Sequence, residues 1–488
     1  MAHKRIENHG KFAGYLTGID ASFLAIENAD PETLMTIAGI YEFHQELDEE
    51  VLRKQLTDFA FQTERYTSVC VRGKSPISRP YWVDIGERFD IANHLVVKHI
   101  PNGTLRDIQD AAAHIVSQPF DMNNPLWHVT YFKTGNPHFS AMLIRTHHCV
   151  TDGQGSMRAL ITFLTSVDPI LRSRRMSQLQ YSAGKYAKKA HKETLGESLT
   201  TPIEHAWATL LAVLAFVYAL FLYGSRSAQL LLNKRTGYLR KSKRALMESQ
   251  LGVSTGIPLE EIKDVKDILQ CTVNDVMVAC TSAAFEQYLA GCDDLVDTHF
   301  TFMAPTSLRK KDDLHVSNES SAYLIRVPVM GDETVRRVHA TRQTMNIAKK
   351  SPEQYLSYWF LQVAFYFPWM VPKAAFSQVD VIHGVITNVP GPSKPLSWAG
   401  KSIMNMYPIV CLPSTNSFGC ALTSYNGSMT ATVQMKLDEQ SPRSAYGAGG
   451  AQAFADLIEV EFRKLQGIVT KPVSPGKELK VSISAKEE

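Results

Sequence analysis

One short segment, His147–Gly153 (HHCVTDG), gathers two histidines, a cysteine and an aspartate within seven residues. A histidine with a pKa near neutrality can take the proton from an alcohol as that alcohol attacks a thioester. An aspartate four residues after the second histidine can bend the loop back and fix it by charge or hydrogen bonds. The segment therefore predicts a general base from one of the two histidines, in a loop that Asp152 holds.

The residues on both sides of this segment predict how it is presented. Phe139–Thr146 has the pattern of a buried strand, and the apolar spacing of Gly153–Val167 predicts a helix. A strand, a tight polar turn and a helix place side chains at the edge of a sheet. We expect Gly153 to permit the sharp exit from the turn, and Asp152 to bond free backbone amides at the start of the helix.

Two other chemistries use the same residues. His147, His148 and Asp152 could ligate a metal ion, but adjacent histidines at a strand end point to opposite faces and rarely reach one ion. Cys149 could act as a covalent nucleophile beside His148, although neighbours on a strand do not readily pair their side chains. We therefore expect no metal site, and the covalent route is the weaker alternative.

Composition limits the class of protein. The chain has 488 residues, 44% hydrophobic and 20% charged, which indicates a globular protein of two domains or two similar halves. A net charge of +3 gives no sign of nucleic-acid binding. The seven cysteines include no CxxC pair, which argues against a disulfide framework and a structural zinc site, and favours a reduced, cytosol-facing compartment.

Strand and helix patterns alternate along two blocks of the chain and predict an α/β or α+β fold. The first block contains expected strands and helices at Leu34–Phe43, Glu50–Glu64, His94–His99, Leu105–Gln118, His128–Phe132 and Phe139–Thr146. The second begins near Thr255 and contains an expected helix, two strands and a hairpin at Val273–Tyr288, Thr298–Met303, Tyr323–Val329 and Phe418–Met435. The Asn426-Gly427 pair is a strong hairpin-turn signal.

Between the blocks, Ala206–Gly224 forms an uncharged, mostly apolar run with basic residues on both sides. As a helix it would be roughly 28 Å long, close to the thickness of a bilayer core. A buried core helix with a solvated linker is the alternative to membrane contact. A single span would place the two blocks on opposite sides of the membrane, so we expect a re-entrant, interfacial or docked segment on the cytosolic face. The predicted units are residues 1–195, a membrane-associating insertion 196–250, residues 251–472 and a polar tail 473–488.

Several motifs in order resemble one family. HHxxxDG is the signature of the CoA-dependent acyltransferase superfamily, which includes chloramphenicol acetyltransferases and peptide-synthetase condensation domains. The surrounding blocks resemble those of the wax ester synthase/diacylglycerol acyltransferases, and the resemblance extends from about Leu16 to Leu465. These blocks are LTGIDASFLAIE (Leu16–Glu27), QPFDMNNPLW (Gln118–Trp127), NDVMVA (Asn274–Ala279), APTSLR (Ala304–Arg309), TNVPGP (Thr387–Pro392) and Met406–Met429.

The resemblance implies a fold of two similar chloramphenicol-acetyltransferase-like domains, each a mixed sheet flanked by helices, with a shared tunnel. It implies His148 as the general base, supported by His147, with Asp152 holding the loop. The residues implied for substrate binding are Gly153, Asn274, Arg309 and Asn388. Acyl-CoA would enter as co-substrate from one mouth and the alcohol from the other, with no cofactor and no covalent intermediate.

The sequence departs from the family at two places. His128 stands where the family usually has Glu after Trp127, and the stretch from about Arg172 to Arg244 is unusual for soluble bacterial members. The expected function is transfer of a long-chain acyl group to a fatty alcohol or diacylglycerol, at the endoplasmic reticulum or a lipid droplet if the source is eukaryotic. Transfer to a sterol, terpenoid or polyketide hydroxyl, and an idle lipid-binding protein on the same fold, are the alternatives. No carrier domain is present, which argues against a condensation domain.

Overall fold

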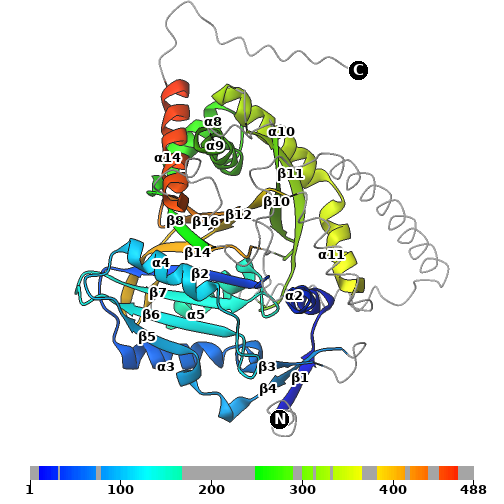
Figure 1. The fold of residues 1–488 in the computed structure, drawn as a ribbon, viewed down its shortest axis with the longest axis vertical. Helices are drawn as coiled ribbons and strands as arrows, with labels where there is room; N and C mark the ends of the chain where they lie inside the picture. Colours follow the sequence, from blue (N-terminus) through cyan, green and yellow to red (C-terminus); the bar gives the residue numbers. More distant parts are fainter. Residues whose placement is uncertain are drawn as a thin grey trace, which may run out of the picture.

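Two mixed β-sheets covered by helices make up most of the part of the chain that the computed structural model describes (Figure 1). The described residues are 10–30, 33–72, 79–167, 248–289, 299–310, 315–329, 333–364, 382–412, 418–437 and 450–470. The predicted apolar segment Ala206–Gly224 and the polar tail 473–488 lie outside these residues. The α/β expectation, with mixed sheets flanked by helices, is confirmed.

The first sheet carries the strand that ends at the histidine pair. Its order is β13-β14-β2-β7-β6-β5, and its pairs are antiparallel except for β5 with β6. Its strands are β13 (Ser397–Trp398), β14 (Lys401–Ile409), β2 (Thr36–Phe43), β7 (Ser140–His147), β6 (Trp127–Lys133) and β5 (Leu95–His99). Its helices are α3 (Glu49–Ala60), α4 (Leu105–Val116) and α5 (Gly153–Val167).

Alternation along the strands places different helices on the two faces of this sheet. On β7, Met142 packs in one core cluster with α3 and α5, whereas its neighbours Ala141 and Leu143 pack in another with α4. Successive side chains of a strand point to opposite faces, so this separation follows from the period of two. Helix α5 is therefore fixed against the sheet immediately after the loop that carries the histidines.

The second sheet has the order β11-β10-β12-β15-β16-β8, with β9 paired to β16. Its strands are β11 (Ser320–Pro328), β10 (His299–Ser307), β12 (Gly384–Pro390), β15 (Phe418–Tyr425), β16 (Ser428–Leu437), β8 (Glu248–Val253) and β9 (Ile257–Pro258). Its helices are α8 (Leu259–Ile268), α9 (Val273–Tyr288), α10 (Thr334–Lys350) and α14 (Gly450–Val469). The expected hairpin turn is confirmed: Asn426 and Gly427 have φ of 47° and 79°, as a tight type I′ turn requires.

Strands from the second half of the chain complete the first sheet. After β12, the chain passes into β13 and β14, and β14 pairs with β2 before the chain returns to β15 (Figure 1). Strand β8 begins inside the predicted insertion and pairs with β16. The first sheet therefore combines strands from the predicted units 1–195 and 251–472, because β14 pairs with β2. The predicted boundary at 195 lies outside the described residues.

A third, three-stranded sheet lies beside the first sheet, and two further helices pack against each other. Its order is β1-β4-β3, with strands β1 (Lys11–Tyr15), β4 (Tyr81–Asp84) and β3 (Ser68–Val71), and short 3₁₀ turns occupy Glu64–Tyr66, Gly86–Arg88 and Ile91–Asn93. Helix α2 (Gly18–Ala29) follows β1 and packs against α11 (Glu353–Ala364), which also packs against β11 of the second sheet. A reciprocal capping box between Thr17 and Asp20 fixes the start of α2.

Among the described residues, no single helix has the length and apolar character needed to cross a membrane. Helices α8 and α9 meet the length and composition criteria only as a pair, bent by 95°. Most of α9 is buried in the core of the second half.

Candidate active site

A cavity of about 210 Å³ lies between the two sheets and receives the loop that follows β7. The first half of the chain contributes residues of α2, β2, β7 and α5 to its lining, and the second half contributes residues of β10, β12, β14 and β15. Four of the predicted site residues line this cavity. His148, Asp152 and Gly153 come from the first half of the chain, and Asn388 of β12 comes from the second half. The cavity is therefore built by both halves of the chain, as a shared tunnel requires.

His148 presents its imidazole to this cavity. Its backbone N–H donates to the Met35 carbonyl at 2.6 Å, and the Phe23 ring stacks on the imidazole with centroids 4.0 Å apart. Its Nδ1 lies 3.3 Å from Oδ1 of Asn318, and no described residue bonds to Nε2. Burial lowers the pKa of His148 below its ordinary value of 6.5, against the opposing charge of Asp152, so the imidazole is neutral and basic near pH 7.

His147 points away from the cavity and is fully buried. The backbone N–H of Cys149 donates to its Nδ1 at 3.0 Å, so the proton resides on Nε2, which donates to Glu27 Oε2 at 3.0 Å. Glu27 also accepts the Met35 N–H at 2.8 Å. Both ring nitrogens are thus occupied, and His147 ties the end of β7 to α2 instead of facing a substrate.

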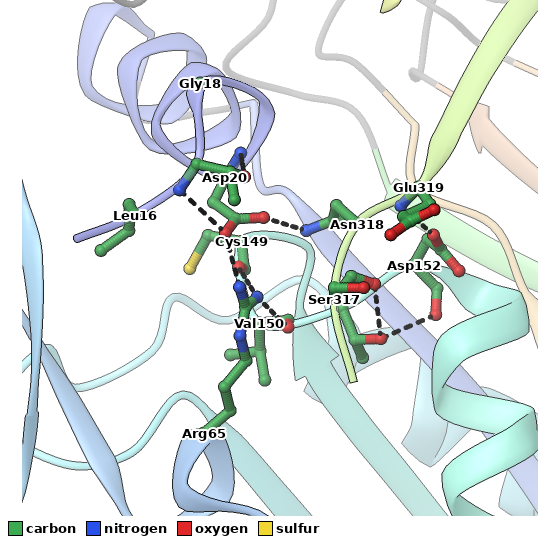
Figure 2. Close-up of polar contacts among 12 residues, drawn as sticks. Leu16, Gly18, Asp20, Arg65, Cys149, Val150, Asp152, Ser317, Asn318 and Glu319 are labelled. Carbon is green, nitrogen blue, oxygen red and sulfur yellow. Dashed lines mark hydrogen bonds and ion pairs between the residues drawn. The ribbon is translucent and has the colours of Figure 1, made fainter. Parts of the chain in front are cut away.

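Asp152 caps α5 and joins the two halves (Figure 2). Its Oδ1 accepts the Gly155 N–H at 2.7 Å, which is the capping bond that the sequence predicts. Its Oδ2 accepts the Glu319 N–H at 2.8 Å and lies 3.3 Å from Nη2 of Arg309. The carboxylate therefore holds the loop in place with three donors, two of them from the second half.

Arg309 lies near the site but is not in the cavity lining. Its side chain is fully buried, and its guanidinium donates to the carbonyls of His315 and Ser317 as well as to Asp152. The structure therefore places it as the partner of Asp152. Asn274 is also outside the lining, and its Oδ1 accepts from Nδ2 of Asn388 at 3.1 Å, so it orients a residue that does face the cavity.

The expectation that Gly153 permits a sharp exit from the turn is wrong. Gly153 is not among the residues with positive φ, and a Cβ there would meet only Val389, at 4.0 Å. The tight position is Gly155, where a Cβ would lie 2.3 Å from Thr151 Oγ1 and 3.1 Å from the Arg309 guanidinium. The close approach of Thr151 in the loop and of Arg309 from the second half, rather than the exit of the turn, is what favours glycine.

Cys149 is poorly placed to be a nucleophile. It is fully buried outside the cavity lining, and burial raises the pKa of its thiol well above the ordinary value of 9.0. A thiol held in its neutral form is a weak nucleophile. Within the described residues, no group of three or more His, Cys, Asp or Glu side chains is arranged to hold a metal ion.

The structure adds four residues that the sequence reasoning did not assign: Asp20, Glu27, Arg65 and Asn318. Asp20 and Glu27 lie seven residues apart on α2, which puts them on one helix face, and an acid on a buried face requires a partner. The spacing of these two acids in the sequence could therefore have indicated that both have polar partners. Asn318 and Arg65 lie in stretches without any motif, and only the fold brings them to the histidine loop.

The chain matches known sequence families over most of its length. Residues 16–277 match the wax ester synthase/diacylglycerol acyltransferase catalytic domain, and residues 316–441 match the C-terminal domain of the same enzymes. The catalytic domain alone covers more than half of the chain. The chain belongs to the wax ester synthase/diacylglycerol acyltransferase family.

Individual members of this family are similar over 71–92% of the chain. A probable diacylglycerol O-acyltransferase of Mycobacterium tuberculosis (strain H37Rv) is 22% identical over 461 residues, covering 92% of this chain and 97% of that protein. The O-acyltransferase WSD of Acinetobacter baylyi is 24% identical over 368 residues, covering 71% of this chain and 76% of that protein. The family and these relatives identify the chain as an acyltransferase.

Solved structures show the same two-domain architecture. The wax ester synthase/diacylglycerol acyltransferase of Marinobacter aquaeolei VT8 superimposes with a TM-score of 0.60 at 21% identity, covering 93% of this chain and 99% of that one. A condensation domain of the CDA synthetase superimposes with a TM-score of 0.58 at 15% identity, covering 95% and 97%. In this acyltransferase, His148 and Asp152 lie in the catalytic-domain match and Asn388 in the C-terminal match, so both family domains build the cavity.

Proposed function

We propose that this acyltransferase moves a long-chain acyl group from acyl-CoA to the hydroxyl of a lipid alcohol, with His148 as the general base. A fatty alcohol would give a wax ester, and diacylglycerol would give triacylglycerol. The observation that carries the proposal is the half-buried imidazole of His148, which faces the cavity between the two halves with an Nε2 to which no described residue bonds. The relatives from Mycobacterium and Acinetobacter are named as O-acyltransferases, which fits this reaction.

The proposed reaction is a direct transfer. The alcohol O–H donates its proton to Nε2 of His148 while the alcohol oxygen forms a bond to the thioester carbonyl carbon. The tetrahedral intermediate collapses, the carbon–sulfur bond breaks, and the CoA sulfur takes the proton back from the imidazolium. No acyl-enzyme is needed, which agrees with the burial of Cys149.

The lining of the cavity supports a lipid acceptor. Apolar side chains dominate it on both halves, among them Ile37, Ile144, Met303, Val385 and Val410. The same lining contains polar side chains, among them His148, Ser156 and Asn388. An apolar channel with a polar reacting centre suits a long aliphatic chain attached to one hydroxyl.

The proposal includes contact of the enzyme with the cytosolic face of a membrane. In the sequence, the apolar segment Ala206–Gly224 favours this contact. Helix α11 supports it from the described residues. It has one charged residue, Glu353, and exposes Tyr355 and Trp359, whereas its Phe360 and Leu361 pack in a cluster with Met35 of the cavity lining. Aromatic residues of this kind favour the membrane–water interface, and α11 would place the cavity beside the lipid.

An acceptor panel tests the reaction. Purified protein is incubated with labelled palmitoyl-CoA and, separately, with hexadecanol, dioleoylglycerol and cholesterol, and the neutral lipids are separated. Labelled wax ester or triacylglycerol, absent from the His148→Ala variant, is the expected result. Product with cholesterol alone would move the assignment to a sterol acyltransferase. No product with any acceptor, from a folded protein, would favour the idle lipid-binding alternative.

A further inference from the structure

We propose that Asn318 is a positioning residue that sets the tautomer of His148, and that the Asp20–Arg65 pair orients Asn318 for this task. The inference rests on the proposed role of His148 as general base. A neutral imidazole has one protonated nitrogen, and only the other can accept a proton. The residue that selects between the two nitrogens therefore decides whether the cavity contains a base.

The amide of Asn318 is held in one orientation by its surroundings. The side chain is 2% exposed, and its Nδ2 donates to Asp20 Oδ1 at 2.8 Å and to the His148 carbonyl at 2.6 Å. Turning the amide over would set its oxygen against these two acceptors and remove a donor from each. Two acceptors on one side thus fix which atom of Asn318 faces the imidazole.

The consequence for His148 follows from that orientation. The atom opposite its Nδ1 is Oδ1 of Asn318, at 3.3 Å, and an oxygen there can only accept. The proton of the neutral imidazole is therefore favoured on Nδ1. Nε2, which bonds to no described residue, keeps its lone pair for the alcohol in the cavity.

Asp20 anchors this arrangement from the first half of the chain (Figure 2). It is fully buried, and its Oδ2 accepts from Nη2 of Arg65 at 2.9 Å and from the Thr17 N–H at 3.2 Å. Arg65 also donates to the Val150 carbonyl at 2.8 Å, which ties it to the histidine loop. Capping of α2 fixes the Asp20 backbone, so the carboxylate is a rigid acceptor for Asn318.

Asn318 comes from the second half of the chain, just before β11, whereas His148 and Asp20 come from the first half. Packing of the two halves therefore forms the cavity and also brings Asn318 to Nδ1 of His148. The buried amide of Asn318 donates to a carboxylate and a carbonyl, so its donor and acceptor ends cannot exchange places. It therefore favours one tautomer of His148. We expect loss of Asn318 to admit the Nε2–H tautomer, in which the cavity-facing nitrogen no longer accepts a proton.

The test uses the full-length protein, four variants at positions 20 and 318, and one control variant. Asn318→Ala removes the acceptor. Asp20→Asn with Asn318→Asp exchanges the two groups. The new amide at position 20 can donate to a carboxylate at 318, which accepts the Nδ1–H of His148 but no longer donates to the His148 carbonyl. The exchange is examined beside each single change, and Asn405→Ala is the matched control, since it removes an amide bond to Glu42 outside the cavity lining.

Two measurements separate positioning from a merely structural role. The first is the ¹⁵N shift of the His148 ring nitrogens, assigned by difference from His148→Gln. The second is kcat and KM for palmitoyl-CoA across pH. We expect Asn318→Ala to mix the tautomers and lower kcat roughly 10- to 100-fold with KM nearly unchanged, as when outer residues that orient an imidazole are lost. The double exchange should restore the Nδ1–H tautomer and move the acid limb of kcat to higher pH, because a carboxylate now faces the ring.

Each outcome bears on one claim. Wild-type tautomer and kcat in Asn318→Ala would overturn the positioning role while leaving the base intact. Asn318→Ala could instead lower both kcat and Tm, with a double exchange that neither restores kcat nor shifts its pH dependence. That result would make Asn318 structural only and would also overturn the positioning role. Activity in His148→Ala would instead remove the proposed base itself.

Discussion

Replacing Asp152 with asparagine is expected to damage stability more than chemistry. The amide has the same shape, but it carries one acceptor oxygen where the carboxylate has two. Whichever way it is turned, its NH₂ faces a backbone N–H, either that of Gly155 or that of Glu319. The change also leaves the buried guanidinium of Arg309 without its counter-charge.

The size of the effect follows from these losses. Breaking a buried ion pair by removing one partner costs about 3–5 kcal/mol, and loss of a helix cap adds about 1 kcal/mol. Arg309 keeps its carbonyl partners, so the lower part of that range is expected. At about 2.1 cal/mol/K per residue, 488 residues have an unfolding entropy of about 1 kcal/mol/K, so Tm should fall by roughly 3–5 °C.

Thermal melting followed by circular dichroism, with kcat measured on the same samples, is the assay. Asp110→Asn is the matched control, because Asp110 pairs with Arg106 at the surface, where both side chains are about half exposed, and its Tm should change by less than about 1 °C. A wild-type melting temperature in Asp152→Asn with a large loss of kcat would refute the reasoning and assign Asp152 a direct part in the reaction.

Three further outcomes are expected. Because burial lowers the pKa of His148 and the base must be neutral, the acid limb of kcat/KM should lie below pH 6.5; a limb above 6.5 would contradict the burial argument. Glu27→Ala should cost about 1–3 kcal/mol, seen as a lower Tm, because His147 Nε2–H and a backbone N–H lose their acceptor; an unchanged Tm would show that this bond is dispensable. Deleting Trp207–Tyr223 should release the protein from vesicles in a flotation assay and lower turnover of long-chain acceptors more than of short alcohols; retained flotation would assign membrane contact elsewhere.

Local patterns in the sequence were sufficient for the elements that flank the histidines. Helix α5 spans Gly153–Val167, as its apolar spacing predicts, and β7 ends at His147, one residue beyond the expected strand. The Asn426-Gly427 turn also lies where the dipeptide predicts it. Each of these features depends on interactions within a few residues, which is why the sequence alone specifies them.

Interactions between distant parts of the chain could not be obtained in the same way. The pairing of β14 with β2, the contact of Arg309 with Asp152 and the contact of Asn318 with His148 each join residues more than 150 positions apart. Motif resemblance placed Arg309 near the site but not its partner. Asn318 lies in a stretch without periodic or motif character, so only the packing of the two halves reveals it.

The most direct measurement of the central claim is steady-state turnover of palmitoyl-CoA with hexadecanol or dioleoylglycerol by the wild type, His148→Ala and Cys149→Ala, each verified as folded by its Tm. A direct transfer with His148 as base requires kcat to fall by about 10²–10⁴-fold in His148→Ala and to remain near wild type in Cys149→Ala. Near-wild-type turnover in His148→Ala, or an inactive Cys149→Ala together with an acyl group trapped on the wild-type cysteine, would contradict it.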